Sequence, residues 1–173
     1  MIPTILVTGG AGFIGSCFVR QQLENARFRI VNLDALTYAG NLWSLPSQHP
    51  DLHFVRGDIA DTELVRSLLK TYRPQAIVHF AAESHVDRSI DGPAAFVHTN
   101  VVGTFNLLQE SLHYYRSLSE LQQNQFSLPA CLHRRSVRIV GRDWQVHGND
   151  GLFSEFSLFR FEGSLRFVRS GLP

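Results

Sequence analysis

The sequence predicts an α/β fold built on a parallel sheet, and three observations support this prediction. Short runs of β-branched and aliphatic residues alternate with stretches of helical periodicity over residues 1–126. Strand, helix and strand at this spacing require right-handed crossovers between parallel strands. Glycines cluster directly after the first predicted strand, at the edge where such sheets bind their ligands.

Four apolar runs are the predicted strands, and three periodic stretches are the predicted helices. Ile2–Val7 has the aliphatic composition of a strand buried on both faces. The other strands are predicted at Arg29–Leu33, Leu52–Val55 and Gln75–Phe80. Helices are predicted from the glycine cluster to about Gln22, over Asp61–Tyr72 with Asp61 or Thr62 as the cap, and over Pro93–Tyr115, where an early proline costs little.

The alternation ends near Phe126, and the composition changes there. Residues 1–126 carry nine Lys and Arg against eleven Asp and Glu, whereas residues 127–173 carry seven Arg, no Lys and four acidic residues. The later segment mixes five Phe with scattered Gly and Ser and has only short apolar runs, such as Val137–Val140. We therefore expect an incomplete α/β domain of about four strands over residues 1–126, and a disordered or poorly packed tail over residues 127–173.

Length and composition limit the class of protein. A chain of 173 residues with 44% hydrophobic and 18% charged residues fits one globular domain. It has no apolar run of membrane-spanning length and no basic, cleavable leader, so no membrane partner is expected. Cys17 and Cys131 lack metal or redox spacing, which favours a cytoplasmic protein with reduced thiols and no metal. A net charge of +1 with scattered Arg gives no support to a nucleic-acid partner.

The glycine cluster has the context of a phosphate-binding loop. Gly9, Gly12 and Gly15, in T-G-G-A-G-F-I-G, follow the first strand and open the first helix. A pyrophosphate requires a tight turn, a closely approachable backbone and free N–H groups at a helix N-terminus. Asp34, 19 residues after Gly15, is placed to bind the adenosine ribose and to repel a 2′-phosphate. The pattern predicts a Rossmann-type doubly wound sheet that binds NAD; the alternative is that the glycines serve turns alone.

The G-x-x-G-x-x-G spacing resembles that of the extended short-chain dehydrogenase/reductase superfamily. Longer segments of the sequence resemble one family within that superfamily. Asp34–Leu42 (D-A-L-T-Y-A-G-N-L) and His79–Ile90 (H-F-A-A-E-S-H-V-D-R-S-I) closely resemble segments of the dTDP-glucose 4,6-dehydratase family. So do Gly57–Ile59, Gly92–Phe96, Thr99–Asn100 and Gly103–Thr104, and together the matches cover essentially all of residues 1–125. Epimerases and reductases share the glycine loop but in general lack A-A-E-S-H-V-D-R-S-I.

The resemblance implies an NAD-dependent lyase that acts on a nucleotide sugar, dTDP-glucose, and it assigns roles to matched positions. The implied cofactor-binding residues are Gly9, Gly12, Phe13, Ile14 and Gly15 at the pyrophosphate, Asp34, Ala35, Leu36 and Thr37 at the adenosine ribose, Asp58 and Ile59 at the adenine, and Ala81, Ala82, Ser84 and Thr99 along the nicotinamide. Ser84, His85 and Asp87 would face the sugar nucleotide. The family commonly dimerises through helices of this domain, including the one that begins at Pro93, which leaves a homodimer open.

Some of these residues have a structural alternative. Asp58 could cap a turn after Gly57, and His85 could be a solvated side chain in a polar loop. Arg88 could pair with a neighbouring acid on the surface. Tyr114 and Tyr115 are expected to pack under the sheet. The histidines without metal spacing are interpreted as structural or surface residues: His53, His79, His98, His113, His133 and His147.

The catalytic segments of the family are absent from the chain. In the family, NAD oxidises sugar C4, water leaves across C5 and C6, and the hydride returns to C6. A Tyr-x-x-x-Lys pair assists the oxidation because the ammonium lowers the phenol pKa, and an S-T-D-E segment supplies the acid and base for elimination. Here the only tyrosines are Tyr38, Tyr72, Tyr114 and Tyr115 and the only lysine is Lys70, so no catalytic residue is assigned.

A change of reading frame near Phe126 would account for this absence. One back-translation of Ser127–Gly141, read one base later, gives R-F-L-H-V-S-T-D-E-V-Y-G-S-L, and the same shift turns Ser157–Gly163 into P-Y-S-A-S-K. Both are catalytic segments of the family, in the family's order. We therefore expect a frame-shifted fragment without turnover. The alternatives are a residual NAD-binding module, an interaction protein that reuses the half-fold, another nucleotide-sugar dehydratase or epimerase, and a genuine new C-terminal module.

Overall fold

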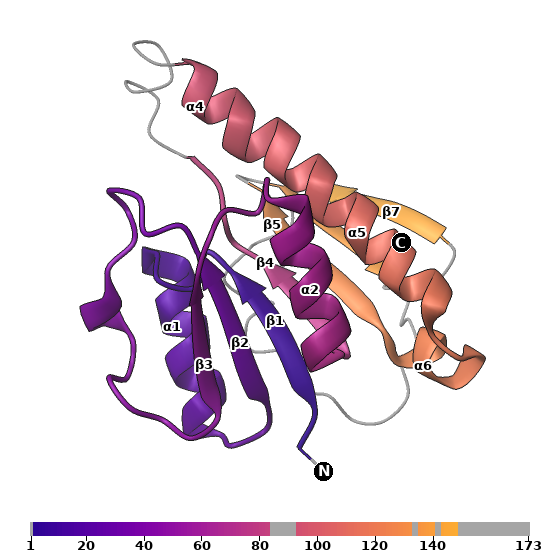
Figure 1. Cartoon of the computed structure of the whole chain (residues 1–173), viewed down its shortest axis with the longest axis horizontal. Helices are drawn as coiled ribbons and strands as arrows, with labels where there is room; N and C mark the ends of the chain where they lie inside the picture. The colour runs from indigo at the N-terminus through magenta and orange to yellow at the C-terminus, as the bar shows by residue number, and fades with distance from the viewer. Residues whose placement is uncertain (1, 84–92, 133–134, 141–142, 149–173) are drawn as a thin grey trace, which may run out of the picture.

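One sheet runs through the molecule, and its parallel strands make up the part that resembles a dinucleotide-binding fold. The computed structural model describes residues 2–83, 93–132, 135–140 and 143–148. The strand order is β3-β2-β1-β4-β5-β6-β7 (Figure 1). The parallel strands are β1 (Thr4–Thr8), β2 (Arg29–Asp34), β3 (Leu52–Arg56), β4 (Ala76–His79) and β5 (Ser127–Leu132). The antiparallel strands β6 (Arg135–Val140) and β7 (Asp143–Gly148) follow.

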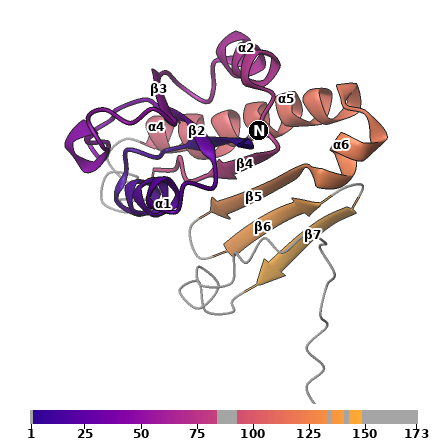
Figure 2. The same cartoon turned by 90° about the horizontal axis from the view of Figure 1, so that it is seen from below.

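Helices lie on both faces of the parallel strands, as a doubly wound sheet requires. α1 (Phe13–Glu24) lies on one face, and α2 (Thr62–Tyr72) and α5 (Thr104–Ser117) lie on the other (Figure 2). α5 continues α4 (Pro93–Val97) through a π-helical segment, η2 (His98–Gly103). Two short helices, η1 (Leu42–Ser44) and α6 (Glu120–Gln125), lie in connections. The predicted Rossmann-type class is therefore confirmed.

The core consists of two apolar layers that the strands supply alternately. Ile5 and Val7 of β1 pack in the layer under α1, whereas Leu6 between them packs in the layer under α2 and α5. This alternation follows from the two-residue period of a strand. Because both faces are covered, the three central residues of β1 are all apolar, which is why its sequence shows no alternation.

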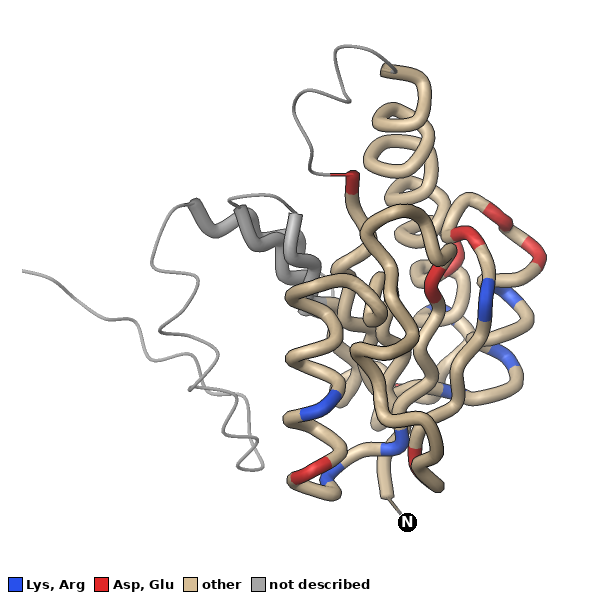
Figure 3. Tube along the Cα trace, turned by 90° about the vertical axis from the view of Figure 1, so that its left-hand side faces the viewer, with Lys and Arg blue, Asp and Glu red and all other residues tan. Residues whose placement is uncertain are grey.

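The charged residues are unevenly distributed along the first strand and helix. No Lys, Arg, Asp or Glu occurs in residues 2–19, so β1 and the first turns of α1 are tan in Figure 3. Elsewhere in the described chain, acidic and basic residues are interspersed (Figure 3). The loop between β1 and α1 therefore has only backbone groups with which to attract an anion.

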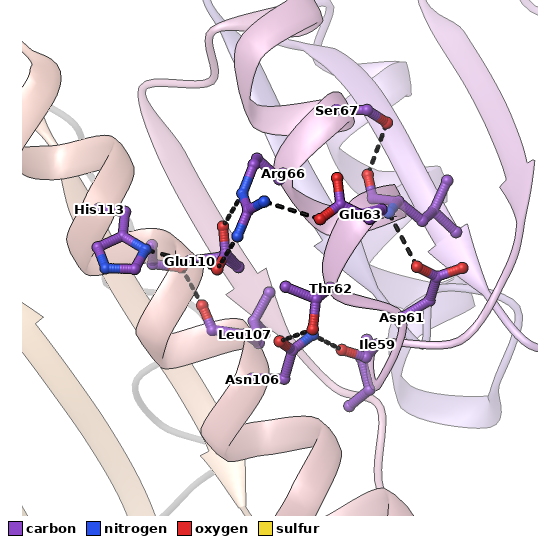
Figure 4. A network of polar contacts seen from close by, with 12 residues as sticks. Ile59, Asp61, Thr62, Glu63, Arg66, Ser67, Asn106, Leu107, Glu110 and His113 are labelled. Atoms are coloured by element: carbon purple, nitrogen blue, oxygen red, sulfur yellow. Dashed lines mark hydrogen bonds and ion pairs between the residues drawn. The ribbon is translucent and has the colours of Figure 1, made fainter.

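Polar side chains join α2 to α5 above their apolar layer (Figure 4). Arg66 forms two hydrogen bonds to the buried Glu110, at 2.9 and 3.1 Å, and a third to Glu63 at 2.8 Å. Asn106 donates to the carbonyl oxygen of Ile59 at 2.7 Å and accepts from Thr62 at 2.7 Å. Hydrogen bonds from Arg66 lower the pKa of the Glu110 carboxyl, which keeps it ionised in its buried position.

Two predicted helices differ in detail from those observed. Asp61 is the N-cap of α2, and its Oδ1 accepts from the Leu64 N–H at 3.0 Å, which confirms one of the two predicted caps. The helix predicted over Pro93–Tyr115 is interrupted by η2. The end of η2 packs against the loop that follows β3, since a Cβ on Gly103 would lie 2.7 Å from Ile59 Cγ1. π-helical turns such as η2 are frequent at functional sites. The spacing of apolar residues in the sequence does not distinguish them from α-helix.

A fifth parallel strand joins the four predicted over residues 1–126, and it comes from the segment that was expected to be disordered or poorly packed. Ser127–Leu132 forms β5 beside β4, because Phe126 and Leu128 are only 6% and 1% exposed and complete the layer under α5. The Tyr114 and Tyr115 rings pack against Phe126 with centroids 5.6 and 6.1 Å away, which confirms their predicted packing role. Pro129 has no N–H for the ladder, so the segment did not have the sequence of a strand. The division of the chain at residue 126 and the poor packing of the tail stay predictions.

Candidate functional site

The loop between β1 and α1 is closed so tightly that two of its glycines admit no side chain. Gly9 has φ +72°, and a Cβ there would lie 2.6 Å from Ala81 Cα in the loop after β4. A Cβ on Gly15 would meet the Gly9 carbonyl oxygen and lie 2.8 Å from Gly10 Cα. The glycines therefore let the loop, the neighbouring strand and α1 pack directly on one another.

The N-terminus of α1 offers uncapped N–H groups to a ligand. Gly12 is the N-cap residue and has no side chain to satisfy them, and the first helical bond runs from the Ser16 N–H to the Gly12 carbonyl at 2.9 Å. Phe13 is 93% exposed, and Ile14 is also exposed, so solvent reaches this end of the helix. The helix dipole and these N–H groups favour a bound phosphate, although the loop contains no basic side chain.

Asp34, at the end of β2, organises the phosphate loop from the carboxyl edge of the sheet. Its Oδ2 accepts from the Ala11 N–H and its Oδ1 from the Leu36 N–H, each at 2.8 Å. Each carboxylate oxygen keeps a further lone pair, which can accept from a ribose hydroxyl. Ala35 and Thr37 beside it are exposed, and Leu36, half-buried, has φ +52°.

Asn32 in β2 is a site residue that the sequence analysis did not single out. Its side chain is fully buried, and its Oδ1 accepts from the Gly10 N–H at 3.1 Å. Among the described residues, its Nδ2 has no hydrogen-bond partner. A polar residue within an otherwise apolar buried strand was the signal that could have identified it, because such a residue must have a partner.

His79 joins the ends of β1 and β4 to the start of α5. Its Nδ1 lies 2.6 Å from Thr8 Oγ1, and its Nε2 lies 3.2 Å from Thr104 Oγ1. The side chain is 1% exposed, and burial lowers the pKa of the imidazole to about 4. His79 is therefore neutral and structural, as expected for the histidines without metal spacing.

Those of the remaining predicted residues that the structure describes lie on either side of the phosphate loop. Asp58 Oδ1 accepts from the Ala60 N–H at 2.8 Å, so it does cap the turn after Gly57, and its Oδ2 lies 3.2 Å from His98 Nε2. Ile59 is buried, and Ala81, Ala82 and Thr99 are half-buried. Ser84, His85 and Asp87 lie outside the described residues.

A bridge of three residues also lies at this edge, and the sequence analysis assigned it no role. Asn100 exchanges two hydrogen bonds of 2.8 Å with the backbone of Glu83, and the Glu83 carboxylate accepts from the Tyr38 hydroxyl at 2.9 Å. Within the described segments, no cluster of His, Cys, Asp and Glu is suited to a metal ion. No helix in those segments is long and apolar enough to cross a membrane.

The sheet order, the glycine loop and the uncapped helix define a protein of the Rossmann dinucleotide-binding class. Within that class, the chain belongs to the GDP-mannose 4,6-dehydratase family, whose model matches residues 6–125.

Relatives of known function that are similar in sequence to this chain are dTDP-glucose 4,6-dehydratases. The dTDP-glucose 4,6-dehydratase of Xanthomonas campestris pv. campestris (strain B100) is 48% identical over 156 residues, which are 89% of this chain and 42% of the relative. That of Salmonella typhimurium is 50% identical over 124 residues, 70% of this chain and 34% of the relative. The chain thus spans less than half of the curated relatives that it matches.

Solved structures agree with these matches. The dTDP-glucose 4,6-dehydratase DesIV of Streptomyces venezuelae, solved with NAD bound, has a TM-score of 0.61 and 52% identity over 64% of this chain and 36% of that one. UDP-glucose 4-epimerase of Thermotoga maritima has a TM-score of 0.59 and 35% identity over 64% of this chain and 34% of that one.

Proposed function

We propose that the chain is the cofactor-binding half of a dTDP-glucose 4,6-dehydratase and that, as written, it binds NAD without completing the reaction. The observation that carries this proposal is the phosphate loop, in which Gly9 and Gly15 admit no side chain and the N-terminus of α1 is uncapped, next to the carboxylate of Asp34. The relatives named dTDP-glucose 4,6-dehydratase support the substrate class. A related UDP- or CDP-sugar dehydratase or an epimerase is the alternative within the family.

The chain's own residues fit a dinucleotide along the carboxyl edge. Gly9, Gly12, Phe13, Ile14 and Gly15 would hold the pyrophosphate through backbone N–H groups. Asp34 would accept from the adenosine ribose, with Ala35, Leu36 and Thr37 beside it. Asp58 and Ile59 would flank the adenine, and Ala81, Ala82, Ser84 and Thr99 would line the nicotinamide side. Ser84, His85 and Asp87 would face the sugar nucleotide. In the intact family, NAD accepts and returns the hydride.

The absence of turnover follows from the residues after Phe126. The chain contains no Tyr-x-x-x-Lys sequence, so no phenol is activated by a neighbouring ammonium to assist oxidation of the sugar. We propose that residues 127–173 are read in a shifted frame, since the match to the family model ends at residue 125 and a one-base shift of one back-translation gives both catalytic segments. Resequencing the coding DNA across Asn124–Ala130 tests this. An added or missing base supports the frame change, and an intact frame refutes it.

A homodimer is proposed through the helix that begins at Pro93. Val97, Val101 and Phe105 are spaced four residues apart along α4, η2 and α5, and they are 49%, 58% and 65% exposed. Apolar residues exposed on one helix face favour burial against a second copy. Sedimentation of the chain and of a Phe105→Glu variant tests this: a dimer that the substitution dissociates is expected, and a monomeric parent chain contradicts it.

NADH titration tests the binding proposal directly. The expected result is saturable binding to the full chain, weaker binding of NADPH because the 2′-phosphate would approach the Asp34 carboxylate, and no conversion of dTDP-glucose. Replacing Gly15 with Val serves as the matched negative control, since its side chain would enter the space of Gly9 and Gly10. Absence of NADH binding by the parent chain would refute the proposed function.

A further inference from the structure

A hydrogen bond joins two loops that lie on opposite sides of the phosphate loop. The Tyr38 hydroxyl donates to Glu83 Oε2 at 2.9 Å across 45 residues of sequence. Tyr38 follows β2 and Glu83 follows β4, and β1 lies between these two strands in the sheet. The phosphate loop leaves the end of β1. The bond between Tyr38 and Glu83 therefore crosses from one side of the phosphate loop to the other.

The Glu83 end of this bridge is fixed by the helix beside it. The Glu83 N–H donates to Asn100 Oδ1, and Asn100 Nδ2 donates to the Glu83 carbonyl, both at 2.8 Å. Asn100 lies in the π-helical segment η2, next to Thr99. Because both backbone groups of Glu83 are held by Asn100, the position of the Glu83 backbone does not depend on Tyr38.

The Tyr38 end is held by the phosphate loop itself. The Gly40 N–H donates to the Thr37 carbonyl at 3.0 Å and closes a turn around Tyr38. The Asn41 N–H donates to the Ala11 carbonyl at 2.9 Å, which fastens the loop after β2 to the phosphate loop. Opening the bridge therefore requires rotation of the Tyr38 and Glu83 side chains but no movement of the backbone.

We propose that Tyr38 and Glu83 form a latch across the proposed dinucleotide site, which sets how fast a dinucleotide enters and leaves; this rests on the proposed NAD binding. A dinucleotide that extends from Asp34 to Thr99 would have to cross the bridge, because Asp34 and Tyr38 follow β2 on one side of the phosphate loop and Glu83 follows β4 on the other. The Tyr38 side chain is close to half exposed, so solvent competes for the bond, and the latch opens transiently. Entry and exit both wait for that opening.

The latch makes a kinetic prediction that a simple contact does not. Tyr38→Phe and Glu83→Ala each break the bridge, so the association and dissociation rate constants of NADH both rise by the same factor, on the order of threefold to tenfold, for one hydrogen bond that is partly exposed to solvent. The Kd stays unchanged. The double variant behaves as either single variant does, because the bridge can be broken only once. Stopped-flow fluorescence with NADH and displacement by excess NAD measures both rate constants.

Two variants serve as controls. Tyr114→Phe also removes a phenol hydrogen bond, of 3.0 Å to the Pro74 carbonyl, but at the opposite edge of the sheet, before β4 begins; it lowers stability and leaves both rate constants unchanged. Glu83→Gln keeps an acceptor oxygen and keeps rates close to those of the parent chain.

The outcomes separate the two proposals. A rise in the dissociation rate constant alone would mean that Tyr38 contacts the dinucleotide, and unchanged rate constants would mean that the bridge is only structural. Either result overturns the latch while NAD binding stands. If the parent chain binds no NADH, the proposed function fails, and the latch fails with it.

Discussion

The stability of this fold should fall in mildly acidic solution because of one buried imidazole. His79 is 1% exposed, and burial lowers its pKa from 6.5 to about 4. Above pH 6.5, both the folded and the unfolded chain hold a neutral imidazole, so pH has no effect through this group. Between 6.5 and about 4, the unfolded chain binds a proton that the folded chain does not, so stability falls as pH falls.

The size of the effect follows from the same two values. At pH 5 the unfolded imidazole is almost fully protonated and the folded one is mostly neutral, which gives a loss of about 2 kcal/mol relative to neutral pH. Below pH 4 the loss levels off at about 3 kcal/mol. These are substantial fractions of a stability of about 5–15 kcal/mol for a whole domain.

Urea unfolding of the parent chain and of His79→Gln measures this contribution. Glutamine keeps a donor and an acceptor for Thr8 and Thr104 but does not titrate. The free energy of unfolding of the parent chain should drop by about 2 kcal/mol more between pH 7.5 and pH 5 than that of the variant. All other titrating groups are shared, so their effects cancel. Equal pH dependence in the two proteins would refute the reasoning, as would an NMR titration of His79 near pH 6.5.

Three further predictions follow from the packing. Gly15→Ala should cost about 1–3 kcal/mol in urea unfolding through overpacking against Gly10. Gly12→Ala should cost much less, because its Cβ would meet only the Gly9 carbonyl, at 3.3 Å; equal costs would contradict the packing argument. Arg66→Ala should lower the urea midpoint and Arg66→Lys should recover only part of it, since lysine cannot form both bonds to the buried carboxylate of Glu110; full recovery would mean that charge alone matters. Limited proteolysis should leave no stable fragment that extends well past residue 150, and finding one would show that the tail is packed.

The sequence predicted those features that depend on local patterns. The first four parallel strands, Asp61 as a cap and the glycine loop all follow from residues within a few positions of one another. Asp34 was predicted as a ligand for a ribose, but its bond to the Ala11 N–H, which shapes the phosphate loop, depends on strand neighbours and was not predicted. The same holds for Asn32 and Gly10.

Features that need long-range packing were missed. The strand β5 forms where the unpaired edge of β4 and the apolar layer under α5 can accept it, and Pro129 conceals this in the sequence. The bridge between Tyr38 and Glu83 joins side chains that no sequence period connects. In the sequence, Tyr38 and Glu83 look like ordinary loop residues. Only the order of the strands in the sheet shows that their loops lie close together.

The residues proposed to bind the cofactor and the missing catalytic segments belong to different stretches of the sequence. The residues proposed to hold the pyrophosphate and the adenosine all precede Phe126. The catalytic segments that would complete the nicotinamide and sugar sites would lie after Phe126, where we propose that the reading frame is shifted. The adenosine half of the cofactor should therefore account for most of the binding energy that remains. ADP-ribose should displace NADH with a Kd within about threefold of that of NADH, a difference of under about 1 kcal/mol. A competition titration with NADH fluorescence measures this, and AMP, which lacks the second phosphate at the α1 N-terminus, should compete far less well. If ADP-ribose failed to displace NADH, contacts to the nicotinamide would dominate the binding, and the adenosine half would not account for most of the binding energy.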